Sequence, residues 1–111
     1  MCWRLAAALD GALPEAEALG AAAGLDVTAN GKVLDVAWGD CACSLRTKDE
    51  GRRRLGAFVR ALLDHGARVQ LVLVEQGVPL ALAGEIEMLP VELLEADGLA
   101  ALPEGRVVEI A

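Results

Sequence analysis

The sequence predicts an α+β fold in which an antiparallel sheet carries two helices on one face. Three observations support this prediction: an alternating stretch near the N-terminus, an Asn30-Gly31 pair between two β-rich runs, and an amphipathic run from Thr47 to His65. A further apolar run follows Gly66. Taken in chain order, these segments give strand, helix, strand, strand, helix, strand.

The first strand is predicted over Cys2–Leu9, where large apolar side chains alternate with small or polar ones. Asp10-Gly11 ends this strand. The first helix is predicted over 14–23, because Pro14 suits the first turn of a helix and Gly24 suits the position just past its end. Its small side chains favour close packing.

The second and third strands are predicted as a hairpin. Asn-Gly favours a two-residue type I′ turn, which needs a positive φ at both central residues. A turn at Asn30-Gly31 would pair Val27 with Leu34 and Leu25 with Val36. One face of the hairpin then carries the larger apolar side chains, namely Leu25, Val27, Leu34, Val36 and Trp38.

The second helix is predicted to begin at a capping box formed by Thr47 and Glu50. Apolar residues recur at spacings of three and four up to His65, and Gly66 ends the helix. The fourth strand, over 67–74, is so apolar that we expect it to be covered on both faces.

This order of elements is typical of ferredoxin-like folds. Right-handed crossovers would give the strand order 4-1-3-2, with both helices on one face. Residues 1–76 would form this core, and residues 77–111 a C-terminal extension. The extension is predicted to hold a strand within Val78–Leu89, helical turns over Val91–Leu102 and a last strand over Arg106–Ile110. All 111 residues are expected to form one domain.

Composition excludes several classes of protein. Hydrophobic residues make up 55% of the chain, which is too many for a disordered protein. The net charge of −7 and the absence of a basic stripe argue against nucleic acid as a partner. No apolar run is long enough to cross a membrane, and no leader segment is recognised. An odd number of cysteines favours a reducing compartment, so the cytoplasm is expected.

The three cysteines, Cys2, Cys41 and Cys43, are the candidate site residues. In the predicted sheet the start of the first strand lies beside the end of the third, so the three thiols should meet at one edge. Three thiolates could bind zinc or another soft metal ion. A thiol redox role for the Cys-x-Cys stretch is an alternative. The simplest interpretation is that these cysteines are small packing residues.

Two other groups of residues are interpreted as structural. Arg52, Arg53 and Arg54 should form a solvated charged surface, because Asp49 and Glu50 lie beside them in the sequence. His65 is expected at the C-terminal end of the second helix, where it interacts with the helix dipole.

Three functional classes remain: a non-catalytic binding or assembly module, a metal-thiolate protein and a thiol redox protein. The first is favoured, because the sheet face away from the helices is predicted to be apolar and small-sided, and such a face needs a cover. The expected cover is the C-terminal extension, with leucines such as Leu94, Leu99 and Leu102, together with a second copy of the chain in a homodimer.

Overall fold

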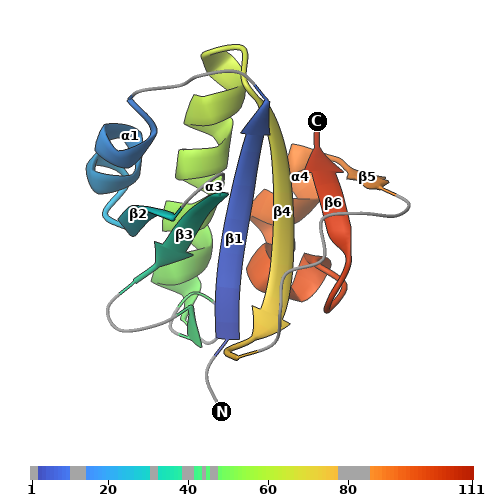
Figure 1. Cartoon of the computed structure of the whole chain (residues 1–111). Coiled ribbons are helices and arrows are strands. Elements are labelled where there is room, and N and C mark those ends of the chain that lie inside the picture. Colours follow the sequence, from blue (N-terminus) through green and yellow to red (C-terminus); the bar gives the residue numbers. More distant parts are fainter. Residues whose placement is uncertain are drawn as a thin grey trace.

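The computed structural model describes residues 3–10, 15–30, 33–38, 42–43, 45, 48–77 and 86–111. Across these residues the chain forms one mixed six-stranded sheet and three α-helices (Figure 1). In chain order the elements are β1 (Trp3–Asp10), α1 (Ala16–Ala22), β2 (Asp26–Asn30), β3 (Val33–Ala37), α3 (Asp49–Asp64), β4 (Arg68–Glu75), β5 (Glu87–Leu89), α4 (Val91–Asp97), the 3-10 helix η1 (Gly98–Ala101) and β6 (Val107–Ile110). None of the described helices combines the length and the apolar character needed to cross a membrane.

The sheet has the order β2-β3-β1-β4-β6-β5. The pairings expected among the first four strands are present, since β1 lies antiparallel between β3 and β4 and β2 pairs with β3. The whole sheet nevertheless differs from the predicted four-stranded one. Strand β6 pairs antiparallel with β4, and β5 pairs parallel with β6. An apolar β4 at the edge would expose unpaired backbone groups, and β6 removes that edge.

The hairpin register is shifted from the prediction. Asn30 pairs with Val33, Ala29 with Leu34 and Val27 with Val36, whereas Val27 was expected to face Leu34. The residues between the innermost pair are therefore 31 and 32, a Gly-Lys sequence, and Gly at the first position of a two-residue connection is also favoured. Because the shift preserves the two-residue period, the same side chains still face the helices.

The second predicted helix, α3, ends as expected but begins differently. Its last residue is Asp64, its C-cap is His65, and Gly66 has a φ of +83° that suits glycine. Its N-cap is Lys48, which makes no side-chain cap hydrogen bond, so the capping box expected from Thr47 and Glu50 is wrong for this helix start. Thr47 lies outside the described residues. The Glu50 carboxylate instead accepts a hydrogen bond from Arg54 Nε at 3.2 Å.

The main core lies between the sheet and its helices. Helix α3 contributes Leu55, Phe58 and Leu62, which pack against sheet residues such as Leu5 and Leu71. In Figure 1, α3 and α4 lie behind the sheet, and α1 lies beside α3 near β2. As predicted, β4 is buried on both faces, because Leu71 and Leu73 belong to this core while Val72 and Val74 belong to a second cluster.

The C-terminal extension packs on the helix side, and this corrects a prediction. Leu94, Leu99 and Leu102 belong to the main core together with Val108 and Ile110, whereas the leucines were expected to cover the opposite face. The physical reason is that α4 presents its apolar side to α3. An added Cβ at Gly56 of α3 would lie only 3.5 Å from the Glu95 Cα, so the two helices approach closely.

The opposite face of the sheet is small-sided and apolar near its middle, as predicted. Ala6, Val72, Val74 and Val107 are buried there, and Val33 is partly buried against them. Whether a second copy of the chain contacts this face stays a prediction.

Candidate functional site

The first candidate site lies where β1 and β3 separate. Their ladder runs from Ala7↔Leu34 to Leu5↔Val36, whereas β1 continues to pair with β4 as far as Trp3↔Glu75. Nearer the N-terminus of β1 than Leu5, the Ala42 N–H donates a hydrogen bond to the Trp3 carbonyl at 3.3 Å. Figure 1 shows β3 leaning away from β1 toward this end of the sheet.

A cavity of about 190 Å³ opens at this separation. We call it the fork pocket. The described residues that line it are Trp3, Arg4, Leu5, Asp35, Val36, Ala37, Ala42 and Gln76. Most of the wall is apolar, and the charged groups among these residues are the side chains of Arg4 and Asp35.

Arg4 and Asp35 form an ion pair in which Nε lies 2.6 Å from Oδ1. The two side chains are 28% and 32% exposed, so solvent screens their attraction. A pair of this kind contributes at most about 1 kcal/mol to stability. Its more important effect is geometric, because it fixes one side of a guanidinium group at the rim of a cavity.

The cysteine prediction is only partly within the described residues. Cys43 is partly buried and forms no disulfide among those residues, while Cys2 and Cys41 lie outside them. Their neighbours in the sequence, Trp3 and Ala42, are joined by the hydrogen bond described above. In the described part of the chain, no group of three His, Cys, Asp or Glu side chains could hold a metal ion. The three-cysteine cluster therefore stays a prediction.

The arginines of α3 form the solvated charged surface predicted from the sequence. Asp49 accepts hydrogen bonds from Arg52 Nη2 at 2.6 Å and from Arg53 Nη2 at 2.7 Å. These bonds, first that of Arg52 and then that of Arg53, lower the pKa of the exposed Asp49 carboxyl below its ordinary value of 3.8. The guanidinium groups are thus matched by carboxylates of the same helix, so this surface is a weak candidate for binding an anion.

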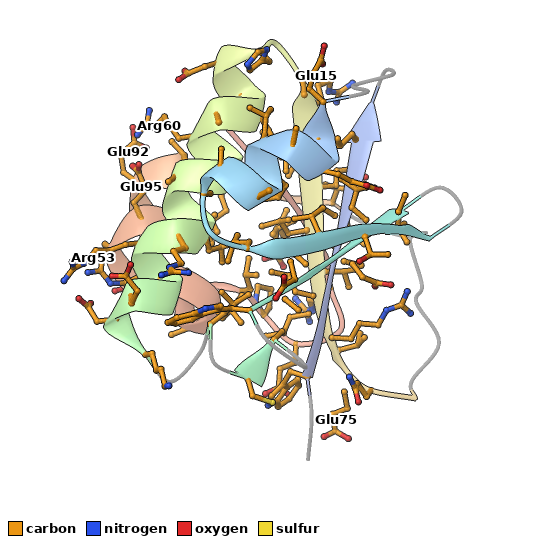
Figure 2. The ribbon with its side chains drawn as sticks, turned by 90° about the vertical axis from the view of Figure 1, so that its left-hand side faces the viewer. Glu15, Arg53, Arg60, Glu75, Glu92 and Glu95 are labelled. Carbon is orange, nitrogen blue, oxygen red and sulfur yellow. The ribbon has the colours of Figure 1, made fainter. Side chains whose placement is uncertain are left out.

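A second charged group joins α3 to α4. Figure 2 shows Arg60, Glu92 and Glu95 grouped where the two helices meet, with Arg53 further along α3. Arg60 Nη2 donates to Glu95 Oε1 at 2.6 Å, and this bond raises the pKa of Arg60. Arg52 Nη1 also donates to the Glu95 carbonyl. These contacts are structural, because they fasten the extension to α3.

Trp38 has a role that the sequence did not reveal. The guanidinium carbon of Arg54 lies 4.5 Å from the centroid of its ring, and Lys48 Nζ lies 5.6 Å from it. Arg54 Nη1 also donates to the Gly24 carbonyl at 2.8 Å. The Arg54 side chain of α3 therefore contacts both Trp38, which follows β3, and Gly24, which precedes β2. The sequence predicted only that Trp38 lies on the apolar face of the hairpin.

The second candidate site lies at the outer edge of β5. Among the described residues, the large hydrophobic side chains that are exposed are Ile86 at 43%, Met88 at 60% and Leu93 at 46%. We call these three residues the β5-edge surface. The sequence predicted instead that the apolar side chains of the extension would cover the sheet face away from the helices. The alternation of Ile86 and Met88 with Glu87 already placed the two apolar side chains on one face of a strand.

Ion pairs flank the β5-edge surface. Arg68 Nη2 lies 2.9 Å from Glu109 Oε1, and Arg106 Nη1 lies 2.9 Å from Glu87 Oε1. Both arginine side chains are exposed, and each pair brings opposite charges to the rim of the apolar residues.

No protein-family model, curated protein or solved structure matches this chain. The fork pocket and the β5-edge surface are therefore the features from which a function is inferred.

Proposed function

We propose that the protein is a non-catalytic binding or assembly module that forms a homodimer through the β5-edge surface. One observation carries this proposal: three large apolar side chains within eight residues are exposed, Ile86 and Met88 at the edge strand β5 and Leu93 on the helix α4 that follows it. Burying apolar surface contributes about 25 cal/mol per Å², and grouped exposed apolar side chains usually mark a contact. The edge position adds backbone groups of β5 that could pair with another strand.

A second copy of the chain is the proposed occupant. A two-fold interface uses the same patch on both subunits, so that patch must complement itself. The rim of the β5-edge surface carries both signs of charge, in the pairs Arg68–Glu109 and Arg106–Glu87. Two copies can therefore meet there without the repulsion that a purely acidic patch would cause, although the net charge of the chain is −7.

We also propose that β1 to β4, with α1 and α3, are a split β-α-β unit of the ferredoxin-like type, which residues 86–111 extend beyond β4. The pairings of β1 with β3 and β4 support this description. The odd number of cysteines in the sequence supports a reducing compartment, the cytoplasm, as the location.

Sedimentation equilibrium of the full chain tests the homodimer. The mass should approach about twice the chain mass of 11.5 kDa as the concentration rises, and it should fall on dilution, because mass action governs assembly. A monomer mass at every concentration would contradict the proposal.

A metal-thiolate protein is the second candidate function, and the hydrogen bond between Ala42 and Trp3 favours it. These residues directly follow Cys41 and Cys2 in the sequence, and Cys43 comes one position after Ala42. A tetrahedral zinc site would need all three thiolates and a fourth ligand.

Metal analysis and thiol titration separate this candidate from thiol redox chemistry and from packing. Protein purified without a metal-affinity tag should contain zinc or another soft metal, and chelation should increase the number of thiols that react. A Cys41→Ser, Cys43→Ser double variant should lose that metal. Metal that persists in the double variant would rule out this site, whereas reversible oxidation without metal would favour the redox alternative.

A further inference from the structure

The guanidinium of Arg4 is only partly used by the protein. It has two bidentate sides, one formed by Nε with an Nη group and the other by the two Nη groups together. Asp35 Oδ1 accepts a hydrogen bond from Nε at 2.6 Å. The structure shows no hydrogen bond from either Nη group of Arg4 to a described residue. The Nη groups therefore keep N–H donors for a ligand, on a residue that lines the fork pocket.

We propose that the fork pocket is a binding site for a small carboxylate, held by the Nη groups of Arg4. A carboxylate matches two parallel N–H donors in spacing and in charge, which is why arginine recognises it bidentately. This site is distinct from the β5-edge surface. A chain that does not bind a carboxylate could still form the proposed homodimer. A monomeric chain could likewise still bind a carboxylate in the fork pocket.

The size of the fork pocket limits the ligand. Its volume of about 190 Å³ is somewhat larger than the roughly 150 Å³ of a cavity known to bind benzene. A dicarboxylate or a monocarboxylate with a short carbon chain has the right size. The partly exposed apolar residues of the lining, Trp3 and Ala37, suit such a carbon chain, and the Gln76 amide offers a further polar contact.

Asp35 has two opposed effects on this site. Its hydrogen bond orients the guanidinium, which reduces the side-chain entropy that a ligand would otherwise cost. Its negative charge also repels an incoming carboxylate. An asparagine at this position keeps an oxygen that can accept from Arg4 Nε and removes the charge, so Asp35→Asn should bind the ligand more tightly than the natural chain.

The test uses glutarate as the probe and glutaramide as a neutral molecule of the same shape. Each is titrated into the ¹⁵N-labelled full chain, and NMR follows the Nε–H of Arg4 and the backbone amides of Arg4, Asp35 and Ala37. Glutarate should shift these signals to saturation, and glutaramide should not. Equal shifts with both molecules, or shifts confined to other residues, would overturn the proposal.

The variant Arg4→Lys and a matched control, Arg60→Lys, show whether Arg4 is the ligand-binding group. Arg4→Lys keeps the charge but loses the bidentate donors, so the affinity for glutarate should fall by about tenfold, the equivalent of roughly one charge-assisted hydrogen bond. Arg60→Lys alters an arginine that is likewise paired with a carboxylate, Glu95 at 2.6 Å, outside the pocket, and should leave the affinity unchanged.

Unfolding midpoints show whether each variant is folded. An unchanged affinity in folded Arg4→Lys would overturn the proposal. If Arg4→Lys does not fold, Asp35→Asn decides: tighter binding of glutarate supports the site, and unchanged or weaker binding overturns it.

Discussion

The two outer strands of the sheet, β2 and β5, differ in how their edges are protected. At β2, the N–H of Ala29 donates to Glu17 Oε1 of α1 at 3.1 Å, and the exposed side chains include Asp26 and Thr28. At β5, the exposed side chains include Ile86 and Met88. An unpaired edge is a template for pairing with another chain unless polar groups cover it. The β2 edge is therefore protected by polar groups of the chain itself, whereas the apolar side chains described at the β5 edge are those that the proposed homodimer would bury.

The side of the molecule that carries β5 is also part of the main core. Residues 86–111 contribute Leu94, Leu99 and Ile110 to it, and each buried side chain of this size contributes about 1.5–3 kcal/mol. Truncation after Gly77 should therefore abolish cooperative folding, because the burial lost with these and the other buried side chains of the extension is comparable to the 5–15 kcal/mol that typically holds a domain together. Urea unfolding followed by circular dichroism measures this. A soluble truncated chain that unfolds cooperatively would show that the extension is dispensable.

The β2 side depends on the close approach of α1 at Gly20. An added Cβ would overlap the Val27 side chain, whose own Cβ would lie only 2.8 Å away. Gly20→Ala should cost about 1–3 kcal/mol despite the better helix propensity of alanine. Gly56→Ala in α3 is the matched control, since its nearest neighbour is the flexible Glu95 side chain at 3.2 Å, and it should change stability by less than about 1 kcal/mol.

Urea unfolding midpoints of Gly20→Ala and Gly56→Ala measure this difference in stability. Equal stability of the two would show that the contact between α1 and β2 is looser than the structure indicates.

Local sequence patterns predicted the helices and the facing of most strands, because each pattern depends on nearby residues. Gly66 ended α3 as expected, and the alternation along β1 correctly placed Leu5 toward the helices. The pairing of β6 with β4 was not predictable, because Val107–Ile110 joins a strand that precedes it by more than 30 residues, and no local pattern encodes that choice.

The candidate sites were harder to predict than the fold. The fork pocket depends on where the β1–β3 ladder stops, at Leu5↔Val36, and hairpin rules set only the local register of β2 and β3. The β5-edge surface was missed because the apolar residues of the extension, Met88 and Leu93 among them, were predicted to cover the sheet face away from the helices. An exposed apolar residue at a sheet edge can be recognised only once the edge is known.

The Glu17 contact offers a finer test of the difference between the edges. Glu17→Ala removes the acceptor from the Ala29 amide, so amide hydrogen exchange at Ala29 should accelerate while global stability falls by less than about 1 kcal/mol. Glu17→Gln keeps an oxygen acceptor and should retain most of the protection. Unchanged exchange in Glu17→Ala would mean that the carboxylate does not protect this edge.

The ion pairs of α3 belong to neither edge and should have the smallest effect. The pKa of Asp49 is lowered by Arg52 and Arg53, so Asp49 should titrate below 3.8 in ¹³C NMR. A lowered pKa stabilises the folded state at pH values above the ordinary value, and this contribution disappears as the pH falls through the lowered pKa. Asp49→Asn should remove this acid-sensitive contribution. A pKa at or above 3.8 would show that the pairs do not persist in solution.

Assembly through the β5 edge is tested most directly by one lysine substitution on each edge strand. Met88→Lys and Thr28→Lys each place a positive charge at an exposed strand position, the first on β5 and the second on β2. Sedimentation velocity should show a dimer for the natural chain and for Thr28→Lys, and a monomer for Met88→Lys, while circular dichroism shows that both variants are folded and unfold cooperatively. Equal assembly of the two variants, whether both dimeric or both monomeric, would contradict assembly through the β5 edge.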